Sequence, residues 1–282
     1  MSRVFPRTTV GGVSMPRLIM GTNWLLGYSH TSSAADEMIR ARNCNREAIA
    51  EIAGVFLDHG VDAVMGLTST DGPLPDGLKL AEDRAGKGFI RIDTPIINVS
   101  DSDSARREAE TAIRQSKKSG SIFCLPHHSS AEQLVNKNLQ AMPRLPDYLK
   151  MIRENGMIPG LSAHMPELVI YSDKNNYDVE TYIQIYNCMG FLMQIEIEFV
   201  HWVIRNAKKP VMTIKPMAAG RCSPFVGLSF AFATLRECDM VTVGCLTPKE
   251  AAEDIEISLA AIERRFPEIG GRSSPKKTEI MK

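Results

Sequence analysis

Eight short apolar runs alternate with helical stretches along this chain, and this alternation constrains the fold more than any other feature of the sequence. Each run has the length of a strand that is buried on both faces, and the stretches between the runs have amphipathic spacing. The runs are 17–24, 61–68, 89–99, 121–127, 157–163, 181–187, 211–217 and 240–245. Three helical stretches end on a glycine directly before the next run, at Gly60, Gly120 and Gly156, as helices commonly do before a strand. Eight strand and helix units in about 250 residues predict an α/β protein with a closed (β/α)8 TIM barrel.

A doubly wound open sheet is the alternative architecture for such an alternation, and it commonly carries a glycine-rich dinucleotide loop. The sequence contains no GxGxxG segment. We therefore expect a single barrel domain over residues 1–266. From 267 to 282 the periodicity is lost and Gly, Pro, Ser and Lys accumulate, which predicts a flexible C-terminal tail.

Composition narrows the classes of partner. The chain has 282 residues, 44% of them hydrophobic, and its 33 Lys and Arg residues balance 33 Asp and Glu residues. A balanced charge does not favour a nucleic-acid or membrane partner, and no stretch approaches the roughly 20 apolar residues of a membrane span. The first residues lack the apolar run of a signal peptide, and the six cysteines form no CxxC pair. We therefore expect a cytoplasmic protein of small-molecule metabolism, and we leave open whether it forms a homo-oligomer.

Histidines follow two neighbouring strands of the predicted barrel. SIFCLPHH ends in His127 and His128, and after one helical stretch MIPGLSAH ends in His164. Because the carboxyl ends of parallel strands face the same side, where barrels bind their ligands, these histidines predict the active site. Since side chains alternate along a strand, His127 and His128 cannot both point inward while still in the strand, and we expect one of them either to face the surrounding helices or to begin the following loop.

A metal site is one interpretation of these histidines. Two imidazoles and a carboxylate would suit zinc or iron with an open position. The sequence has no HxH or HExxH spacing, so we favour histidines that form hydrogen bonds or orient a substrate, and we assign no metal ligand.

Lys215 lies at the end of another apolar run, in VMTIKPMAAGR. A desolvated lysine there has a lowered pKa and can act as a base or form a Schiff base with a carbonyl substrate. The alternative is a lysine that reaches out to the rim or pairs with a carboxylate. Gly220 and Arg221 follow in the next turn, and Gly244 ends the last run, so these two loops are candidates for binding an anion such as phosphate.

Several segments resemble the aldo/keto reductase superfamily. RTTVGGVSMPRLIMGTNW is similar to that family's opening, a hairpin below the barrel followed by a first strand that ends in Gly-Thr, and QIYN resembles its sixth strand. MIPGLSAHMPEL is similar to its fifth strand, and MVTVGCLTPKEAAEDI to its eighth strand and last helix. The resemblance implies an N-terminal β-hairpin cap on the barrel and NADP(H) as the cofactor. Ser162 and Asn187 lie in the segments that carry this resemblance, and together with Gly220, Arg221 and Gly244 of the two anion-binding loops they are our candidates for cofactor contacts.

The sequence departs from this family at the reacting centre. The family uses a Tyr as proton donor, a Lys and an Asp that lower the pKa of that Tyr, and a His that orients the substrate. Only the His has a counterpart here, at the end of SIFCLPHH. The Asp is missing, because Met65 stands where the second strand would end in Asp. The segment after Met65 contains no Tyr, and the third strand region IDTPIINV contains no Lys. A carbonyl reduced by hydride needs a proton, which His127 could supply instead.

Three hypotheses follow for the function. The first is a divergent barrel of the aldo/keto reductase type, an oxidoreductase that acts on a small carbonyl or phosphorylated metabolite with NADP(H). The second is a non-redox lyase, aldolase, epimerase or metal-dependent hydrolase that uses Lys215 or the three histidines. The third is a barrel that has lost catalysis and serves in binding.

Overall fold

A parallel β-sheet forms a closed barrel in the computed structural model, which describes residues 4–270. Nine strand segments pair in the order β7-β6-β5-β4-β3-β11-β10-β9-β8. They are β3 (Leu18–Gly21), β4 (Ala63–Gly66), β5 (Ile90–Asp93), β6 (Phe123–Cys124), β7 (Ile158–Pro159), β8 (Leu161–Ala163), β9 (Tyr182–Ile185), β10 (Val211–Ile214) and β11 (Met240–Val243). The predicted TIM barrel is confirmed, although each strand is shorter than the apolar run from which it was predicted.

The barrel closes at Gly160. β7 pairs with β6 and β8 pairs with β9, so the segment from Ile158 to Ala163 is one strand that changes neighbour at this glycine. A Cβ atom on Gly160 would lie 2.7 Å from the carbonyl oxygen of Thr181 and 2.8 Å from Leu125. Only glycine fits at this junction, because the two flanking strands approach its backbone too closely for a side chain.

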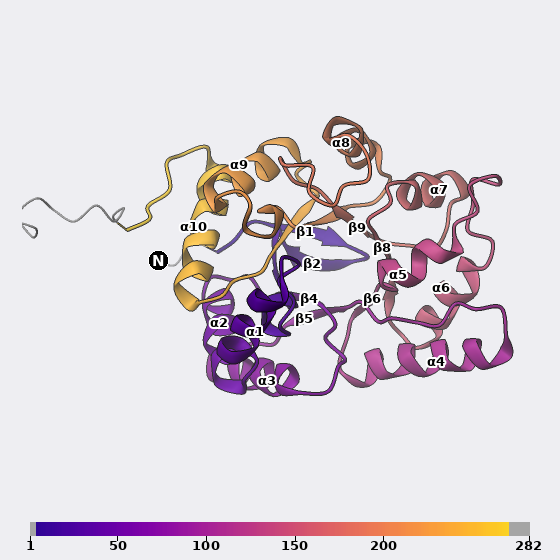
Figure 1. The fold of residues 1–282 in the computed structure, drawn as a ribbon, viewed down its shortest axis with the longest axis horizontal. Coiled ribbons are helices and arrows are strands. Elements are labelled where there is room, and N and C mark those ends of the chain that lie inside the picture. Colours follow the sequence, from indigo (N-terminus) through magenta and orange to yellow (C-terminus); the bar gives the residue numbers. More distant parts are fainter. Residues whose placement is uncertain (1–3, 271–282) are drawn as a thin grey trace, which may run out of the picture.

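Helices surround the strands in a ring (Figure 1). They are α1 (Ser33–Asn43), α2 (Arg46–Asp58), α3 (Pro73–Ala85), α4 (Asp103–Lys118), α5 (His128–Ala131), α6 (Leu145–Glu154), α7 (Glu167–Asn175), α8 (Ile197–Asn206), α9 (Pro224–Thr234) and α10 (Pro248–Glu263), with short 3-10 turns at Asn23–Leu25, Glu132–Leu134 and Ala218–Gly220. Several begin at a side-chain cap, such as Ser102 before α4 and Thr247 before α10. The polar connection between β3 and α2 contains α1.

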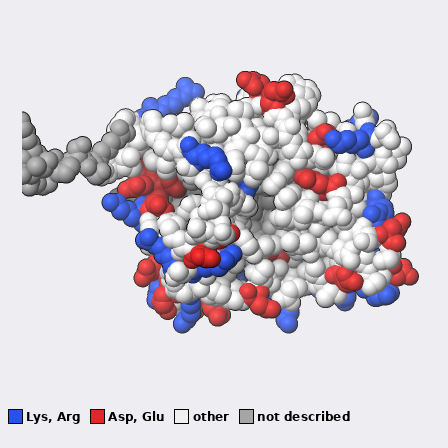
Figure 2. Space-filling model, in the orientation of Figure 1, with Lys and Arg blue, Asp and Glu red and all other residues white. Residues whose placement is uncertain are grey.

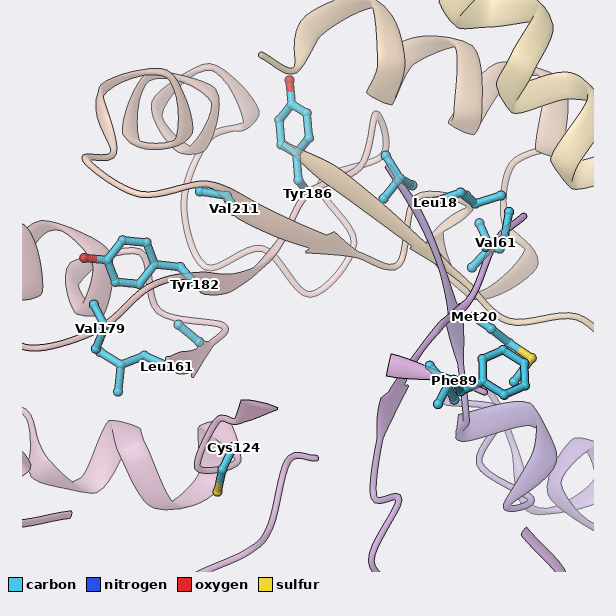
Figure 3. Close-up of a cluster of buried hydrophobic side chains, with 14 of the residues drawn as sticks. Leu18, Met20, Val61, Phe89, Cys124, Leu161, Val179, Tyr182, Tyr186 and Val211 are labelled. Atoms are coloured by element: carbon cyan, nitrogen blue, oxygen red, sulfur yellow. The ribbon is translucent and has the colours of Figure 1, made fainter. Parts of the chain in front are cut away.

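The side chains of the strands form two layers. Those that point into the barrel, including Ile19, Ile92 and Met212, make an inner cluster. Those that point outward pack against the helices, and Figure 3 shows members of this larger cluster, among them Tyr182 and Tyr186. Because successive side chains of each strand point alternately inward and outward, one set fills the barrel interior and the other set packs against the helices.

A two-stranded hairpin closes one end of the barrel, as the resemblance implied. β1 (Arg7–Val10) and β2 (Val13–Pro16) pair antiparallel. Val10 and Met15 are fully buried and belong to the inner cluster. The hairpin thus caps the amino-terminal end of the strands and leaves the carboxyl end free for a site.

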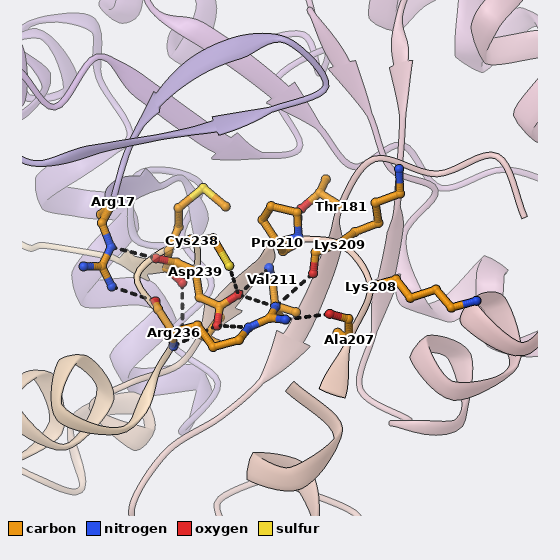
Figure 4. A network of polar contacts seen from close by, with 12 residues as sticks. Arg17, Thr181, Ala207, Lys208, Lys209, Pro210, Val211, Arg236, Cys238 and Asp239 are labelled. Atoms are coloured by element: carbon orange, nitrogen blue, oxygen red, sulfur yellow. Dashed lines mark hydrogen bonds and ion pairs between the residues drawn. The ribbon is translucent and has the colours of Figure 1, made fainter. Parts of the chain in front are cut away.

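A buried carboxylate ties the strands together at this same end (Figure 4). Asp239 is fully buried and accepts hydrogen bonds from the backbone N–H of Val211 at 2.9 Å and from the guanidinium of Arg236 at 2.7 Å. Arg236 donates in turn to the carbonyl oxygen of Ala207, and Arg17 donates to the carbonyl oxygen of Asp239. The network links β3, β10 and β11 below the barrel.

The predicted tail falls partly outside the described residues. Residues 267–270 run back along α10, where the backbone N–H of Glu268 donates to Glu256. Residues 271–282 lie outside the described part. Within residues 4–270, no helix combines the length and the apolar character needed to cross a membrane.

Candidate active site

A cavity of about 170 Å³ opens at the carboxyl ends of the barrel strands. The surface is hollowed near the middle of this face (Figure 2). The apolar wall of the cavity is formed by Trp24, Met65, Ile183, Ile214, Pro216 and Met217. The polar residues of the cavity are Thr22, Asn23, His30, Thr94, His127, His128, Ser162, His164, Lys215 and Thr242. The cavity is therefore a pocket at the end of the barrel where such folds bind ligands.

All four predicted catalytic side chains lie in this cavity. His127, His128, His164 and Lys215 come from three different strand ends, and each contributes to the wall. Of the predicted cofactor contacts, Ser162, Gly220 and Gly244 also line the cavity; the other two lie elsewhere.

The Asn187 side chain is fully buried and bonds its own loop, accepting from the backbone N–H groups of Met189 and Phe191. The Arg221 guanidinium lies 4.0 Å from the centre of the Phe191 ring. Asn187 thus shapes the loop before α8 rather than the cavity wall.

The structure places neither His127 nor His128 within the strand, and of the two expected positions it has the one beyond the strand end rather than the one facing the helices. Strand β6 ends at Cys124, so the alternation of a strand no longer applies three residues later. His127 is the N-cap residue of α5 and His128 is the first residue of that helix, and both rings turn into the cavity. The rings of His128 and His164 stack with their centres 3.6 Å apart, and His127 lies 4.2 Å from His128.

The N-cap contact indicates which nitrogen of His127 carries the proton. Nδ1 accepts a hydrogen bond from the backbone N–H of Ser129 at 3.3 Å and lies 2.8 Å from the Ser129 hydroxyl. In the neutral ring the proton is then on Nε2. His127 accordingly presents an N–H donor rather than a lone pair.

Glu132 holds the loops that carry the other two histidines. Its Oε1 accepts from the backbone N–H groups of His164 at 2.7 Å and Met165 at 2.9 Å, and its Oε2 lies 3.9 Å from Nδ1 of His128. Burial raises the pKa of this carboxyl, but the contacts with His128 and the two N–H groups outweigh burial and lower it. Glu132 is therefore an anion that fixes the stacked pair in place.

Three histidines of the cavity are neutral at physiological pH. Burial, reinforced by His128 and Lys215, lowers the pKa of His164 to about 3. Burial and His128 lower the pKa of His127 to about 4. Burial and then Lys215 lower the pKa of His30 to about 4. The described residues that line the cavity include one Lys and no Arg, Asp or Glu.

Lys215 occupies a strained backbone position. Its φ is +60°, and φ is also positive at Ala218 and Ala219 in the following turn. Residues other than glycine adopt this conformation only where the surrounding structure enforces it, and such positions concentrate at functional sites. Burial lowers the pKa of the Lys215 ammonium to about 8. Within residues 4–270 no carboxylate pairs with it, so the alternative of a lysine in a structural ion pair does not apply.

His30 is a cavity residue that the sequence patterns did not single out as a site. It lies before α1, has a φ of +58°, and its Nε2 is 2.8 Å from Nδ2 of Asn23. Since the Asn23 amide donates, the proton of the neutral His30 ring is on Nδ1. Its position in a polar connection on the ligand side of the barrel is the only signal that could have indicated it.

The geometry separates the chemistries considered from the sequence. No tyrosine is among the lining residues of the described chain; Tyr182 and Tyr186 point outward and donate to Asp173 and Thr234. Among residues 4–270 no group of three or more His, Cys, Asp or Glu is arranged to hold a metal ion. The rings of His128 and His164 are stacked, so their nitrogen lone pairs lie in nearly parallel planes. Lone pairs in parallel planes do not converge on a single metal ion.

The arrangement defines a (β/α)8 barrel with a basic pocket, and comparison with solved structures specifies the barrel type. A protein from Pseudomonas aeruginosa provisionally classed as an aldo-keto reductase matches with a TM-score of 0.64 and 15% identity, over 92% of this chain and 97% of that one. An aldo-keto reductase from Klebsiella pneumoniae in complex with NADPH matches with a TM-score of 0.52 and 14% identity, over 94% and 92%. An aldose reductase from Giardia lamblia matches with a TM-score of 0.53 and 12% identity, over 90% and 89%.

This chain thus has the fold of the aldo-keto reductases, as its segments suggested. No family model matches it, and no curated protein matches it by sequence. At such low identity the likeness establishes the fold alone, and the function has to be argued from the cavity.

Proposed function

We propose that this protein is an enzyme that acts on a small carbonyl compound through an imine on Lys215. The observation that carries the proposal is an ammonium group inside a cavity that has no carboxylate among its described lining residues. Its lowered pKa, about 8, leaves an appreciable fraction of neutral amine near physiological pH. An amine of this kind is the nucleophile that carbonyl chemistry needs.

The steps balance with one proton from solvent. The neutral Nζ of Lys215 adds to the carbonyl carbon, the carbonyl oxygen takes one proton from Nζ and one from solvent, and it leaves as water while the protonated C=N bond forms. The protonated imine then accepts the electron pair of an adjacent C–H or C–C bond, which is the chemistry of an epimerase, lyase or aldolase. The proton of a broken C–H bond passes to a neutral imidazole of the cavity, and the fragment of a broken C–C bond leaves as a carbonyl compound. His127, with an N–H on Nε2, is the donor available to the carbonyl oxygen.

The charge of the cavity favours a substrate with one negative charge or none. Lys215 is the one Lys or Arg among the described lining residues, and its imine keeps a positive charge when protonated. A carboxylate next to the imine would be stabilised by that charge, whereas a dianion would leave one charge without a partner. Small 2-oxo acids are therefore the first compounds to test.

Reductive trapping tests this proposal. Sodium cyanoborohydride with pyruvate should fix one adduct on the wild-type chain, and peptide mapping should place it on Lys215. The Lys215→Arg variant keeps the charge and should give no adduct at that peptide, while Lys118→Arg, at an exposed position, should behave as wild type. Trapping spread over surface lysines, with Lys215 unmodified under every carbonyl compound tried, would overturn the proposal.

An NADP(H)-linked reductase is the second candidate, favoured by the likeness to a fold solved with NADPH. Gly220 has no heavy atom within 4 Å of the place of a Cβ, so a ligand can approach its backbone, and the exposed Arg221 beside it adds positive charge. These residues would hold the cofactor, which would supply the hydride. The Lys215 ammonium would donate the proton, and the neutral His127 would donate a hydrogen bond to the carbonyl oxygen through Nε2–H. Titration with NADPH, followed by nicotinamide fluorescence, decides this candidate; no binding at saturating protein would exclude it.

The convergence of imidazole and ammonium groups argues against the third hypothesis. A barrel that only binds partners through its surface has no need to keep an unpaired lysine at a strained backbone position. If Lys215 is not trapped by any carbonyl compound and NADPH does not bind, the hypothesis of a barrel that has lost catalysis and serves in binding becomes the favoured one.

A further inference from the structure

The outer face of α8 and the loop before it expose an unusual amount of apolar surface. Of the fourteen large hydrophobic side chains that are exposed in the described chain, seven lie between residues 189 and 226. They are Met189, Leu192, Ile195, Phe199, Trp202, Phe225 and Val226, which we call the α8 patch. Trp202 is 55% exposed.

Two aromatic side chains of the α8 patch adjoin each other. The rings of Phe199 and Trp202 lie 5.7 Å apart on α8. The loop before α8 touches the turn before α9, because the sulfurs of Cys188 and Cys222 are 3.8 Å apart. Residues scattered singly on a surface need no explanation, but a contiguous group with two aromatic side chains marks an interaction surface.

Two unpaired charges flank the aromatic side chains on this helix. Glu198 stands in the first turn of α8 and Arg205 in the last. Neither forms an ion pair within residues 4–270. Positions 198, 202 and 205 are spaced by four and three residues, so they lie on one helix face with the tryptophan between the charges.

We propose that a second copy of this chain docks on the α8 patch, with the two α8 helices antiparallel about a two-fold axis near Trp202. This arrangement places Glu198 of each copy opposite Arg205 of the other, because the axis passes midway between the two positions. A two-fold interface must be complementary to itself, and a helix with an acid at one end, a base at the other and an aromatic centre meets that requirement. The aromatic pair supplies the apolar centre and the charges set the antiparallel register.

The charge pattern favours a second copy over a membrane surface. A helix that lies on a membrane carries lysines and arginines along its polar face. Here an acidic residue occupies one end of the exposed face, and Glu196 adjoins it. Binding to anionic phospholipid vesicles without self-association would therefore overturn the proposal.

Sedimentation equilibrium over a concentration series tests the interface. The wild-type chain should form dimers, and Glu198→Arg or Arg205→Glu should each weaken association at least tenfold, because like charges then face each other across the axis. The double variant Glu198→Arg with Arg205→Glu should restore dimers. Leu139→Ser, at a similarly exposed apolar position away from α8, should leave association unchanged.

Trp202 also reports directly on the interface. In a Trp24→Phe background it is the only tryptophan, and its emission should shift to longer wavelength on dilution as the dimer dissociates. Far-UV circular dichroism confirms that each variant is folded. A wild-type chain that stays monomeric at the highest concentration, or a double variant that fails to restore association, would contradict the proposal.

Discussion

Replacing Lys215 with methionine should stabilise this protein at neutral pH while removing its proposed nucleophile. The ammonium of Lys215 lies in a partly buried cavity without a carboxylate partner, and burial lowers its pKa from 10.5 to about 8. That difference corresponds to about 3 kcal/mol by which the fold disfavours the charged form. Because the side chain is partly exposed, solvent screening reduces this figure, and we expect a gain of about 1 to 2 kcal/mol for Lys215→Met.

The sign of this effect can be checked by its pH dependence. Near pH 7 the lysine is protonated in both the folded and the unfolded chain, so the wild type carries the full penalty. Between about pH 8 and pH 10.5 the unfolded chain binds more protons than the folded one, and wild-type stability relative to the variant rises with pH. The advantage of Lys215→Met should therefore shrink as the pH approaches about 10.5.

Urea unfolding followed by circular dichroism measures the difference in free energy of unfolding between Lys215→Met and wild type, at neutral pH and near pH 10.5. Lys118→Met, which changes an exposed lysine at the end of α4, is the matched control and should change stability by less than about 0.5 kcal/mol. A Lys215→Met variant less stable than wild type at neutral pH, or equally favoured at both pH values, would refute the reasoning.

Three further predictions concern the site and the base of the barrel. Because the folded-state pKa of His164 is lowered to about 3, the unfolded chain binds more protons below about pH 6.5, so stability should fall as the pH drops from 6.5 towards 4, and His164→Gln should flatten that slope in urea titrations. Asp239→Asn should lower the free energy of unfolding by about 3 kcal/mol, since it unbalances a buried ion pair, whereas Asp178→Asn, in an exposed pair, should cost less than about 1 kcal/mol. Gly66→Ala should lower the melting temperature by several degrees, because the new Cβ would lie 1.9 Å from the hydroxyl oxygen of Thr22; an unchanged midpoint would mean that Thr22 moves freely.

The barrel could be predicted from the sequence because each strand is buried on both faces, and a strand buried on both faces consists of consecutive apolar residues. The side of the barrel that carries the site followed from the strand ends, and the four predicted catalytic residues lie together there. Strand lengths were overestimated, since residues that follow a strand inside the barrel, such as Leu125, are as apolar as the strand itself.

Other features depend on contacts that no local pattern records. His127 and His128 both enter the cavity because a helix begins between them, and the alternation rule fails outside a strand. His30 reaches the cavity through a loop with a left-handed backbone position, which its neighbours in sequence do not indicate. Asn187 is directed into its own loop by backbone N–H groups two and four residues further on.

The pH dependence of trapping at Lys215 tests the central claim most directly. Reductive trapping with pyruvate is followed at the peptide that contains Lys215, with the pH as the only variable. The account predicts that the yield rises to half its maximum near pH 8, as the amine in the carboxylate-free cavity loses its proton. A yield that rises only near pH 10.5, in step with exposed lysines, would show that the cavity does not activate this amine.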